Sequence, residues 1–389
     1  MPQRSFIWIL ASSGFASTFS GRAVEPMVGI IARDLATPVE TAALLAAAFA
    51  LPYAFIQPIL GPIGDALGKE RVMKVCLALL VLALFGSTLA PDITTLFALR
   101  IVAGAAAGGV IPLALALVGD RVEMARRQVA ISRLLIAVIT GQLVGSSLAG
   151  IVAAFIGWRG VFVISAVMMV VAFVATLTGF RNAPRGAAFD LGTALRRYGE
   201  ILRNPRARLL FGFVFVEAIA VFSIFPYLAP LLEERGQGGS AEAGLALAGF
   251  AIGGLVYSAL VRWMLATLGL RLMLVAGGII SAAAFLAFGL AGSWQMDTLA
   301  MLALGTGFYM LHNSFQTQVT ELAPQARASA VALHAFSFFC GQALGVVVFG
   351  FGLRAIGLLP SMAISAVAIL LVGLAAAATL TRPGQPRAL

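Results

Sequence analysis

The sequence predicts an all-α integral membrane protein with twelve transmembrane helices in two pseudo-symmetric bundles of six. Three observations predict this class. Of the 389 residues, 61% are hydrophobic and 11% are charged, and the mean hydropathy is +1.01; both lie far from the values of soluble globular domains. Apolar windows of about 20 residues, long enough to cross a hydrocarbon core as helices, recur along the chain. The two halves of the chain also share a sequence pattern at an offset of 200 residues.

The predicted spans follow one another with short connections. The first window contains Arg22 and Glu25 and has no small-residue cleavage site after it, so we expect a retained helix and not a signal peptide. In chain order the predicted spans are 6–29, 41–63, 72–90, 93–119, 128–155, 160–180, 208–232, 241–264, 271–292, 296–319, 327–353 and 358–381.

Basic residues are divided unequally between the two sides of the predicted membrane. If the amino terminus is cytoplasmic, the inner segments hold twenty lysines and arginines and the outer loops hold four. The positive-inside rule then predicts that both termini are cytoplasmic. Because the basic residues lie mainly on the predicted inner side of the membrane, the net charge of +10 indicates a lipid bilayer and not a nucleic acid as the partner.

The chain lacks the residue patterns of cofactor, metal and catalytic sites. Cys76 and Cys340 fall inside two different predicted spans, which indicates neither a disulfide framework nor a metal cluster. The patterns GxxxxGK[ST] and HExxH do not occur, and no Ser/His arrangement is evident. The sequence therefore predicts no cofactor, no metal and no enzymatic activity.

Residues 181–207 interrupt the hydrophobic pattern and divide the chain evenly. They predict a cytoplasmic linker between one bundle at 1–180 and another at 208–389. Within the linker, apolar residues recur at helical spacing, namely Leu191, Leu195, Tyr198 and Leu202. This spacing predicts an amphipathic helix on the inner membrane surface, and a loosely ordered basic loop is the alternative.

The two halves of the chain resemble each other in sequence. The segment GQLVGSSLAGIVAAFIG from Gly141 aligns with GQALGVVVFGFGLRAIG from Gly341, and Pro26 aligns with Pro226. The tetrapeptide ISAV at 164 repeats at 364. We interpret this register as an internal duplication of six helices.

The loop between the second and third predicted spans carries a signature, GPIGDALGKERVM, whose informative residues are Gly61, Asp65, Gly68 and Arg71. With the duplicated six-helix unit, it resembles the major facilitator superfamily, in which glycines of this loop allow a tight turn between helices. The resemblance implies that Asp65 faces the amino-terminal end of the eleventh span, where unpaired N–H groups favour an anion, and so clasps the two halves. Lys69 and Glu70 stand where the pattern has two basic residues.

The fourth predicted span, LRIVAGAAAGGVIP, resembles a second motif of that family, a membrane arginine followed by glycines. Gly104 and Gly108 lie on one helix face and allow close approach of a neighbour. Arg100 either bonds backbone carbonyls or, as the resemblance implies, controls proton exchange electrostatically. In the fifth span, Ser146 occupies the place of a proline in the antiporter motif.

The first span contains two ionisable residues three positions apart. Arg22 and Glu25 share a helix face and can neutralise each other. They form either a self-contained pair or a site in which Glu25 accepts a proton or a cationic substrate while Arg22 sets its charge state. Pro26 follows and can open the helix toward a central cavity.

Glu217 has no basic neighbour in its own predicted helix. It either binds a proton or substrate in a central cavity or pairs with Arg262 or another inner arginine near the cytoplasmic end. His312 is a candidate proton shuttle, whereas His334 fits a packing role better. Further candidates for lining a cavity are Gln142, Phe222, Phe225, Pro226, Tyr227, Asn313 and Gln342. The glutamines could instead join helices, and the aromatic residues could face lipid.

The resemblance implies a monomeric secondary transporter of a bacterial inner membrane that moves a small organic solute by alternating access. Without an ATP-binding motif the energy source is an ion gradient, and intramembrane carboxylates favour protons. Similarity to the bacterial efflux branch, through Pro26, Asp65, Arg100 and GWRGVF, implies export by proton antiport. Proton-coupled uptake and a non-transporting sensor or assembly protein are the alternatives.

Overall fold

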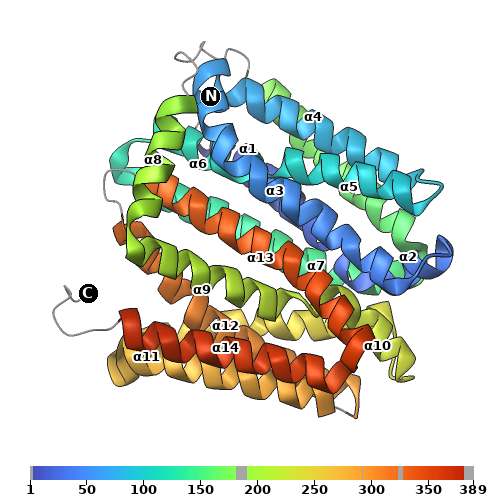
Figure 1. Cartoon of the computed structure of the whole chain (residues 1–389). Coiled ribbons are helices and arrows are strands. Elements are labelled where there is room, and N and C mark those ends of the chain that lie inside the picture. The colour runs from blue at the N-terminus through green and yellow to red at the C-terminus, as the bar shows by residue number, and fades with distance from the viewer. Residues whose placement is uncertain (1–2, 181–190, 291, 323–326, 381–389) are drawn as a thin grey trace. The chain divides into compact units, whose positions relative to one another are not determined.

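The computed structural model describes residues 3–180, 191–290, 292–322 and 327–380, and in these ranges it is helical without a β-strand (Figure 1). The predicted all-α class is therefore confirmed. The elements are α1 (Gln3–Arg22), η1 (Glu25–Met27), α2 (Val28–Asp34), α3 (Val39–Leu67), α4 (Lys69–Thr88), α5 (Ile93–Ala107), α6 (Val110–Arg121), α7 (Met124–Gly179), α8 (Leu191–Arg203), α9 (Pro205–Phe222), η2 (Phe225–Tyr227), α10 (Leu228–Glu234), α11 (Ser240–Leu290), α12 (Trp294–Leu322), α13 (Arg327–Ile356) and α14 (Leu358–Leu380).

Two of these helices are broken at a glycine. Gly157 in α7 has φ 70° and ψ 170°, and Gly269 in α11 has φ 67° and ψ 171°. A positive φ is accessible to glycine at little steric cost, so each glycine ends one helical stretch and begins another. A straight helix of 56 residues would be about 84 Å long, far more than the roughly 30 Å of a hydrocarbon core. The breaks fall between predicted spans, as the sequence indicates.

Among the described residues, eight helical segments are long and apolar enough to cross a membrane. Two of them contain these breaks, so each of the two covers two predicted spans. The predicted spans 6–29 and 296–319 are not among the eight, so the predicted count of twelve is not confirmed in full. The reason is polarity: α1 is rich in serine and ends at Arg22, and α12 carries a buried Asp297 together with histidine, asparagine and glutamine residues.

Large apolar side chains are exposed on many of the helices. Examples are Trp8 on α1, Phe155 on α7 and Phe351 on α13. A soluble monomer rarely exposes so much apolar surface, whereas the lipid-facing side of a transmembrane helix is expected to be apolar. The exposure thus agrees with a multi-pass membrane protein.

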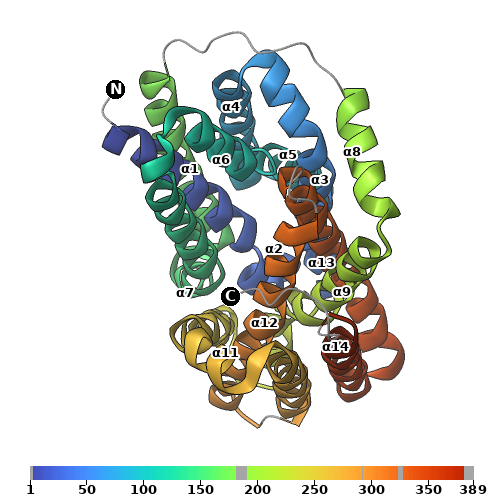
Figure 2. The ribbon, with the colours of Figure 1, turned by 90° about the vertical axis from the view of Figure 1, so that its left-hand side faces the viewer.

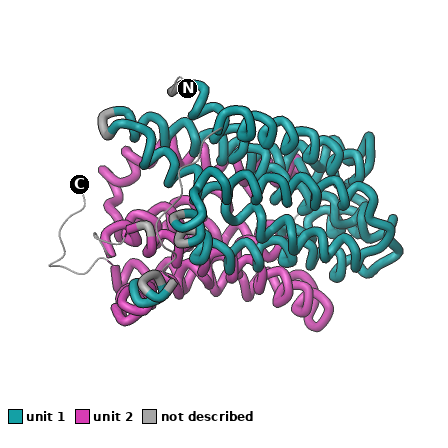
Figure 3. Tube along the Cα trace, turned by 90° about the horizontal axis from the view of Figure 1, so that it is seen from above, with its two compact units in different colours: residues 1–197, 225–244 teal, residues 198–224, 245–389 magenta. Residues whose placement is uncertain are grey.

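The Cα trace forms two compact units, which Figure 3 shows in separate colours. Unit 1 comprises residues 1–197 and 225–244, and unit 2 comprises residues 198–224 and 245–389. The segment 225–244 therefore groups with unit 1, although α9 directly before it groups with unit 2. The six-helix limits proposed from the sequence stay a prediction.

The sequence duplication recurs in the packing inside each unit. α7 lies along α1 (Figure 2), and a Cβ at Gly141 would overlap the carbonyl oxygen of Phe15. In unit 2, α13 lies along α9, and Gly341 meets the carbonyl oxygen of Phe215 in the same way. The same offset of 200 relates a second pair of contacts: a Cβ at Gly145 would meet the carbonyl oxygen of Phe19, and a Cβ at Gly345 would meet that of Ile219. Small residues that let two helix backbones approach closely thus act at equivalent positions of both copies.

The second part of the linker forms the predicted helix. α8 spans Leu191–Arg203, so the alternative of a loose loop is wrong for this stretch, while residues 181–190 lie outside the described residues. Leu195 is 59% exposed, and Leu202 is exposed as well. An exposed apolar stripe is typical of a helix at a membrane surface, and that location stays a prediction.

Candidate functional site

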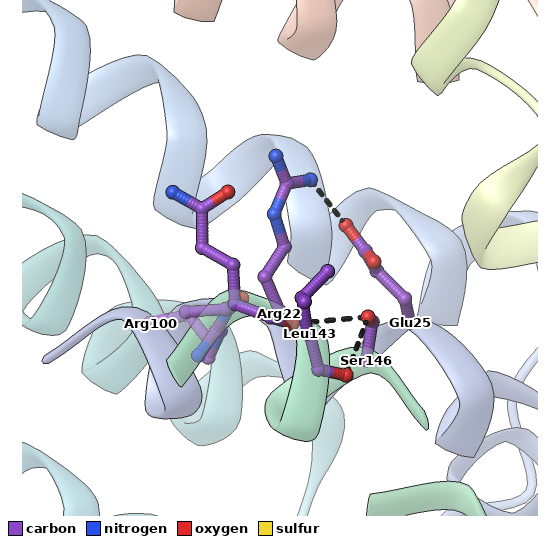
Figure 4. Close-up of polar contacts among 7 residues, drawn as sticks. Arg22, Glu25, Arg100, Leu143 and Ser146 are labelled. Carbon is purple, nitrogen blue, oxygen red and sulfur yellow. Dashed lines mark hydrogen bonds and ion pairs between the residues drawn. The ribbon is translucent and has the colours of Figure 1, made fainter. Parts of the chain in front are cut away.

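The first polar site lies in unit 1, where α1 gives way to η1. Arg22 is the last residue of α1, and Glu25 is the first residue of η1. Arg22 Nη1 donates a hydrogen bond to Glu25 Oε1 at 2.7 Å, as Figure 4 shows. Glu25 is 3% exposed, and its Oε2 is buried without a hydrogen-bond partner among the described residues. The predicted pairing is thus present, and one carboxylate oxygen can still accept a donor.

Pro26 is buried in η1 directly after Glu25. Proline has no N–H to donate, so it interrupts the ladder of helical hydrogen bonds at this point. The 3-10 turn and the new start at α2 are the local consequence. The break allows Glu25 to lie at the junction and not on a continuous helix face.

Arg100 on α5 caps the end of α1. Its side chain is 0% exposed, and its Nη1 and Nη2 donate to the carbonyl oxygens of Ser20 at 3.1 Å and Gly21 at 3.2 Å. Nε donates to Leu45 O at 3.4 Å, and the guanidinium lies 4.4 Å from the Phe49 ring centroid. The last carbonyls of a helix lack partners within it, and a cation there also interacts favourably with the helix dipole. Of the two predicted roles, this geometry matches backbone bonding.

α7 packs against η1 and contributes Ser146 to the same region (Figure 4). Ser146 Oγ donates to the carbonyl oxygens of Gln142 at 3.0 Å and Leu143 at 3.2 Å. A hydroxyl bonded back to the preceding turn bends a helix slightly, so Ser146 is a mild substitute for the proline of the antiporter motif. Gln142 itself is half-buried.

The signature loop forms a tight turn between α3 and α4. Gly68 has φ 91°, a conformation that favours glycine. Arg71 is exposed on the first turn of α4. The side chains of Gly61 and Asp65 lie outside the described residues, so the proposed clasp stays a prediction.

Lys69 and Glu70, the two residues that follow Gly68 in this loop, bind the end of α6. Lys69 Nζ donates to Asp120 Oδ2 at 2.6 Å, and Glu70 forms an ion pair with Arg121. Nothing in the sequence singled out Asp120 and Arg121. Because the partners are 51 residues apart, no local spacing could have revealed these pairs.

At the other end of unit 1, Arg33 on α2 forms an ion pair with Glu233 on α10. The two positions are 200 residues apart, the offset of the sequence repeat. The carboxylate also lies against Gly29, where a Cβ would be 2.9 Å from Glu233 Oε2. The segment 225–244 is therefore attached to unit 1 by equivalent positions of the two copies.

Asp34 forms a second polar cluster beside this pair. Trp158 Nε1 donates to Asp34 Oδ2 at 3.0 Å, and Arg159 forms an ion pair with the same oxygen. The hydrogen bonds from Arg159 first and Trp158 second hold the pKa of Asp34 below its usual value. The carboxylate is therefore charged at neutral pH and links α2 to the break in α7.

The second buried polar site lies in unit 2, around Glu217 on α9. Glu217 is 0% exposed, and its Oε2 lies 2.9 Å from His312 Nδ1 on α12. Either a protonated Nδ1 donates to the carboxylate or a protonated carboxyl donates to Nδ1. Glu217 Oε1 is buried without a hydrogen-bond partner among the described residues. The partner of Glu217 is thus His312, and the alternative of a pair with Arg262 is wrong.

Aromatic rings surround His312. Phe308 stacks on its ring at 4.9 Å between centroids, and Phe338 lies at the same distance. Phe222 packs against both of these phenylalanines and against Phe250. Phe222 is therefore buried beside the Glu217–His312 pair, and the alternative in which it faces lipid is wrong.

The remaining aromatic candidates lie in the other unit. Phe225, Pro226 and Tyr227 form η2 and are buried in unit 1, so they too do not face lipid. Among the polar candidates, the Asn313 side chain lies near the Tyr257 hydroxyl, and Gln342 is buried in α13.

His334, for which the sequence favours a packing role, lies beside His312. It is 3% exposed, and its ring centroid lies 5.1 Å from that of His312. The available signal was that the chain contains two histidines in total, on consecutive helices. In the described ranges no group of three or more His, Cys, Asp or Glu side chains is placed to hold a metal ion.

Comparisons of the sequence with known proteins give a consistent result. The sequence profile of the Major Facilitator Superfamily matches residues 10–346. The MFS-type transporter YceJ of Bacillus subtilis (strain 168) is 21% identical over 351 residues, which cover 89% of this chain and 88% of YceJ. YtbD of the same organism is 25% identical over 58% of this chain, and the match spans 56% of its length. The multi-drug resistance efflux pump PmrA homolog of Lactococcus lactis is 29% identical over 33% of each chain.

Solved structures show the same fold. A POT family transporter, crystallised with a thioalcohol-conjugated peptide, has a TM-score of 0.79 at 14% identity and covers 97% of this chain and 96% of its own. The nucleoside transporter NupG has a TM-score of 0.77 at 16% identity, with 97% and 100% covered. The helical architecture, the packing repeat and the profile match agree. The chain therefore belongs to the Major Facilitator Superfamily, and it is a multi-pass membrane transporter and not an enzyme.

Proposed function

We propose that this protein is a proton-coupled secondary transporter that exports a small organic solute by alternating access. The observation that carries the proposal is the Glu217–His312 pair. Here a fully buried carboxylate lies 2.9 Å from an imidazole. Both groups can gain and lose a proton, and imidazole does so near neutral pH in water.

The burial of Glu217 supplies the energetic reason for coupling. An isolated charge within a membrane protein costs free energy unless it is paired, solvated or neutralised by a proton. The proton on the Glu217–His312 pair and a substrate that donates to Glu217 Oε1 would therefore compete. Such competition lets each ligand bind one conformation better than the other, which a ligand must do to shift the equilibrium.

The Arg22–Glu25 pair of unit 1 is the second candidate carrier. The negative charge of Glu25 is already compensated by Arg22 at 2.7 Å. Glu25 therefore needs a proton less than Glu217 does in order to remain buried. Its free Oε2 can accept a donor from a substrate. We assign Glu25 to substrate contact and Glu217 to the proton.

The direction of transport is proposed from a relative. The Lactococcus lactis homologue carries the description of a multi-drug resistance efflux pump, which favours export by antiport. Proton-coupled uptake remains the second candidate, because the same acids serve either direction. We further propose a monomer in a bacterial inner membrane with both termini cytoplasmic, since basic residues gather on the predicted inner side.

The test uses the purified full chain reconstituted in vesicles that enclose a pH-sensitive dye, with ethidium as the fluorescent organic probe. An outward or inward ethidium gradient should drive protons in the opposite direction through the wild type. Glu217→Gln should abolish this proton movement, whereas Glu200→Gln, at an exposed position on α8, is the matched control. Proton movement in the same direction as ethidium would instead support uptake by symport. Unchanged coupling in a variant that carries both Glu217→Gln and Glu25→Gln would contradict the assignment of carriers.

A further inference from the structure

The helix α8, which precedes α9 in Figure 1, carries an apolar line and a basic line of side chains next to each other. Its sequence repeats a Leu-Arg step at a spacing of seven residues, first as Leu195 and Arg196 and then as Leu202 and Arg203. Seven positions are almost two full turns of an α-helix, so the two leucines lie on one line along the helix and the two arginines lie on another, about 100° away. We call these lines the leucine stripe and the arginine stripe.

The side chains of both stripes are exposed. Leu195 is 59% exposed and Leu202 is 42% exposed, and Arg196 and Arg203 are exposed as well. The buried residue of α8 is Ile201, at 7%, and it lies on the side of the leucine stripe that faces away from the arginine stripe. The described part of the chain therefore leaves the leucine stripe uncovered.

We propose that α8 binds anionic phospholipids of the inner leaflet, with the leucine stripe among the acyl chains and the arginine stripe on the phosphate groups. An amphipathic helix at a membrane surface buries its apolar face at the boundary between headgroups and acyl chains. A guanidinium binds a phosphate through two parallel N–H groups, and the alkyl stem of an arginine extends along apolar surface while its charge stays in the polar layer. This inference goes beyond the proposed function, since it holds for either direction of transport and for any substrate.

The charge of α8 favours an anionic headgroup over other occupants. The helix contains three arginines and one acidic residue, Glu200. A zwitterionic headgroup presents a cation beside its phosphate, which the arginines would repel. A second copy of the chain would bring the same positively charged surface to the contact, because an isologous interface joins identical patches. An anionic lipid instead supplies both the apolar chains that the leucines need and the negative charge that the arginines need.

Thermal unfolding of the purified full chain in detergent tests the lipid preference, because a lipid that binds the native state raises the Tm. We expect added dioleoylphosphatidylglycerol to act at lower concentration than dioleoylphosphatidylcholine. An arginine near an anionic surface contributes about fivefold in affinity, so Arg196→Gln should raise the half-maximal phosphatidylglycerol concentration about fivefold, and the double variant with Arg203→Gln about 25-fold.

Arg197→Gln is the matched control for these variants. It removes the same charge from the next residue, which is also exposed but lies on the side of the helix opposite to the leucine stripe. It should leave the half-maximal concentration close to that of the wild type, and the Tm of each variant without added lipid shows whether the fold is kept. Equal half-maximal concentrations of the two lipids, or equal effects of Arg196→Gln and Arg197→Gln, would overturn the proposal.

A spin label on α8 identifies what covers the leucine stripe. Leu195→Cys and Arg197→Cys are each labelled in a full chain that also carries Cys340→Ala, since the other cysteine, Cys76, is buried. In nanodiscs of phosphatidylglycerol, oxygen dissolved among the acyl chains should relax the label at position 195, and a water-soluble nickel complex should relax the label at position 197. Access of nickel to both labels would place α8 in water, and spin–spin broadening at position 195 would place a second copy on the stripe. Either result would overturn the proposal.

Discussion

Replacement of Arg100 tests whether this residue caps α1. The guanidinium donates three hydrogen bonds to the carbonyl oxygens of Ser20, Gly21 and Leu45, at 3.1, 3.2 and 3.4 Å, from a site with no solvent exposure. Lysine keeps the charge but replaces a planar fork of five N–H groups by one compact ammonium. We expect Arg100→Lys to lose two of the three bonds.

A hydrogen bond to a charged group contributes about 1.5–3 kcal/mol, so loss of two bonds should destabilise the protein by about 3–6 kcal/mol. The carbonyls of Ser20 and Gly21 lie at the end of α1 and have no helical partner to replace the guanidinium. The loss should therefore not be recovered by a local shift of the helix.

Thermal unfolding of the purified full chain, followed with a thiol-reactive fluorescent dye, measures this effect. Cys76 is a buried free cysteine, so the dye reports its exposure on unfolding. Arg100→Lys should lower the Tm by several degrees, and Arg71→Lys, at an exposed position, is the matched control. If both variants unfold at the wild-type temperature, Arg100 does not stabilise the end of α1 and the reasoning is refuted.

Substitutions at three further contacts test other parts of the structure. Gly104→Ala places a Cβ in overlap with the carbonyl oxygen of Phe49, so it should open the contact between α3 and α5 and cost about 1–3 kcal/mol in unfolding free energy. Asp34→Asn should lower the stability at neutral pH, because the pKa of the Asp34 carboxyl is lower in the folded protein than in the unfolded chain, and such a shift stabilises the fold above the unfolded-state pKa. The difference in stability between the variant and the wild type should vanish as the pH falls through the folded-state pKa of Asp34. Arg33→Glu and Glu233→Arg should each lower the Tm, and the double exchange should restore it. The coupling energy between the two positions should be about 0.5 kcal/mol, within the range of about 0.2–1 kcal/mol that is typical of exposed ion pairs.

Each of these expectations has a result that contradicts it. A Gly104→Ala variant as stable as wild type would mean that the two helices separate without cost. A stability gap for Asp34→Asn that persists at acid pH would show that its charge is not the source. Independent, additive effects of the two charge reversals would show that Arg33 and Glu233 are not coupled.

The helical fold could be predicted from the sequence because the features that indicate it, apolar windows and the glycines between them, are local in the chain. Apolar windows set the helices, and the glycines between windows mark the breaks at Gly157 and Gly269. The pairing of Arg22 with Glu25 was accessible because the two residues are three positions apart in the chain, although Glu25 lies in η1 after the end of α1 and not on the same helix face. The packing repeat was visible as the aligned segments from Gly141 and Gly341.

The partners of buried charges were not accessible in this way. Glu217 and His312 are 95 residues apart, and Arg100 lies 79 residues from the carbonyl of Gly21. Such contacts depend on helix packing and leave no spacing in the chain. Arg262 was the wrong choice for Glu217 because the sequence shows charge but not depth. The helices α1 and α12 are also too polar to be recognised as membrane spans from length and hydropathy alone.

The ion pair between Arg33 and Glu233 bears on how such a chain could arise. In an isologous dimer of identical chains, a residue on the twofold axis meets its own copy, and two arginines or two glutamates would then repel each other. A single chain with two copies of the unit escapes this restriction, since position 33 and position 233 are encoded separately. Opposite charges at two equivalent positions in contact with each other are therefore possible in a single chain that carries both copies, but not in a homodimer.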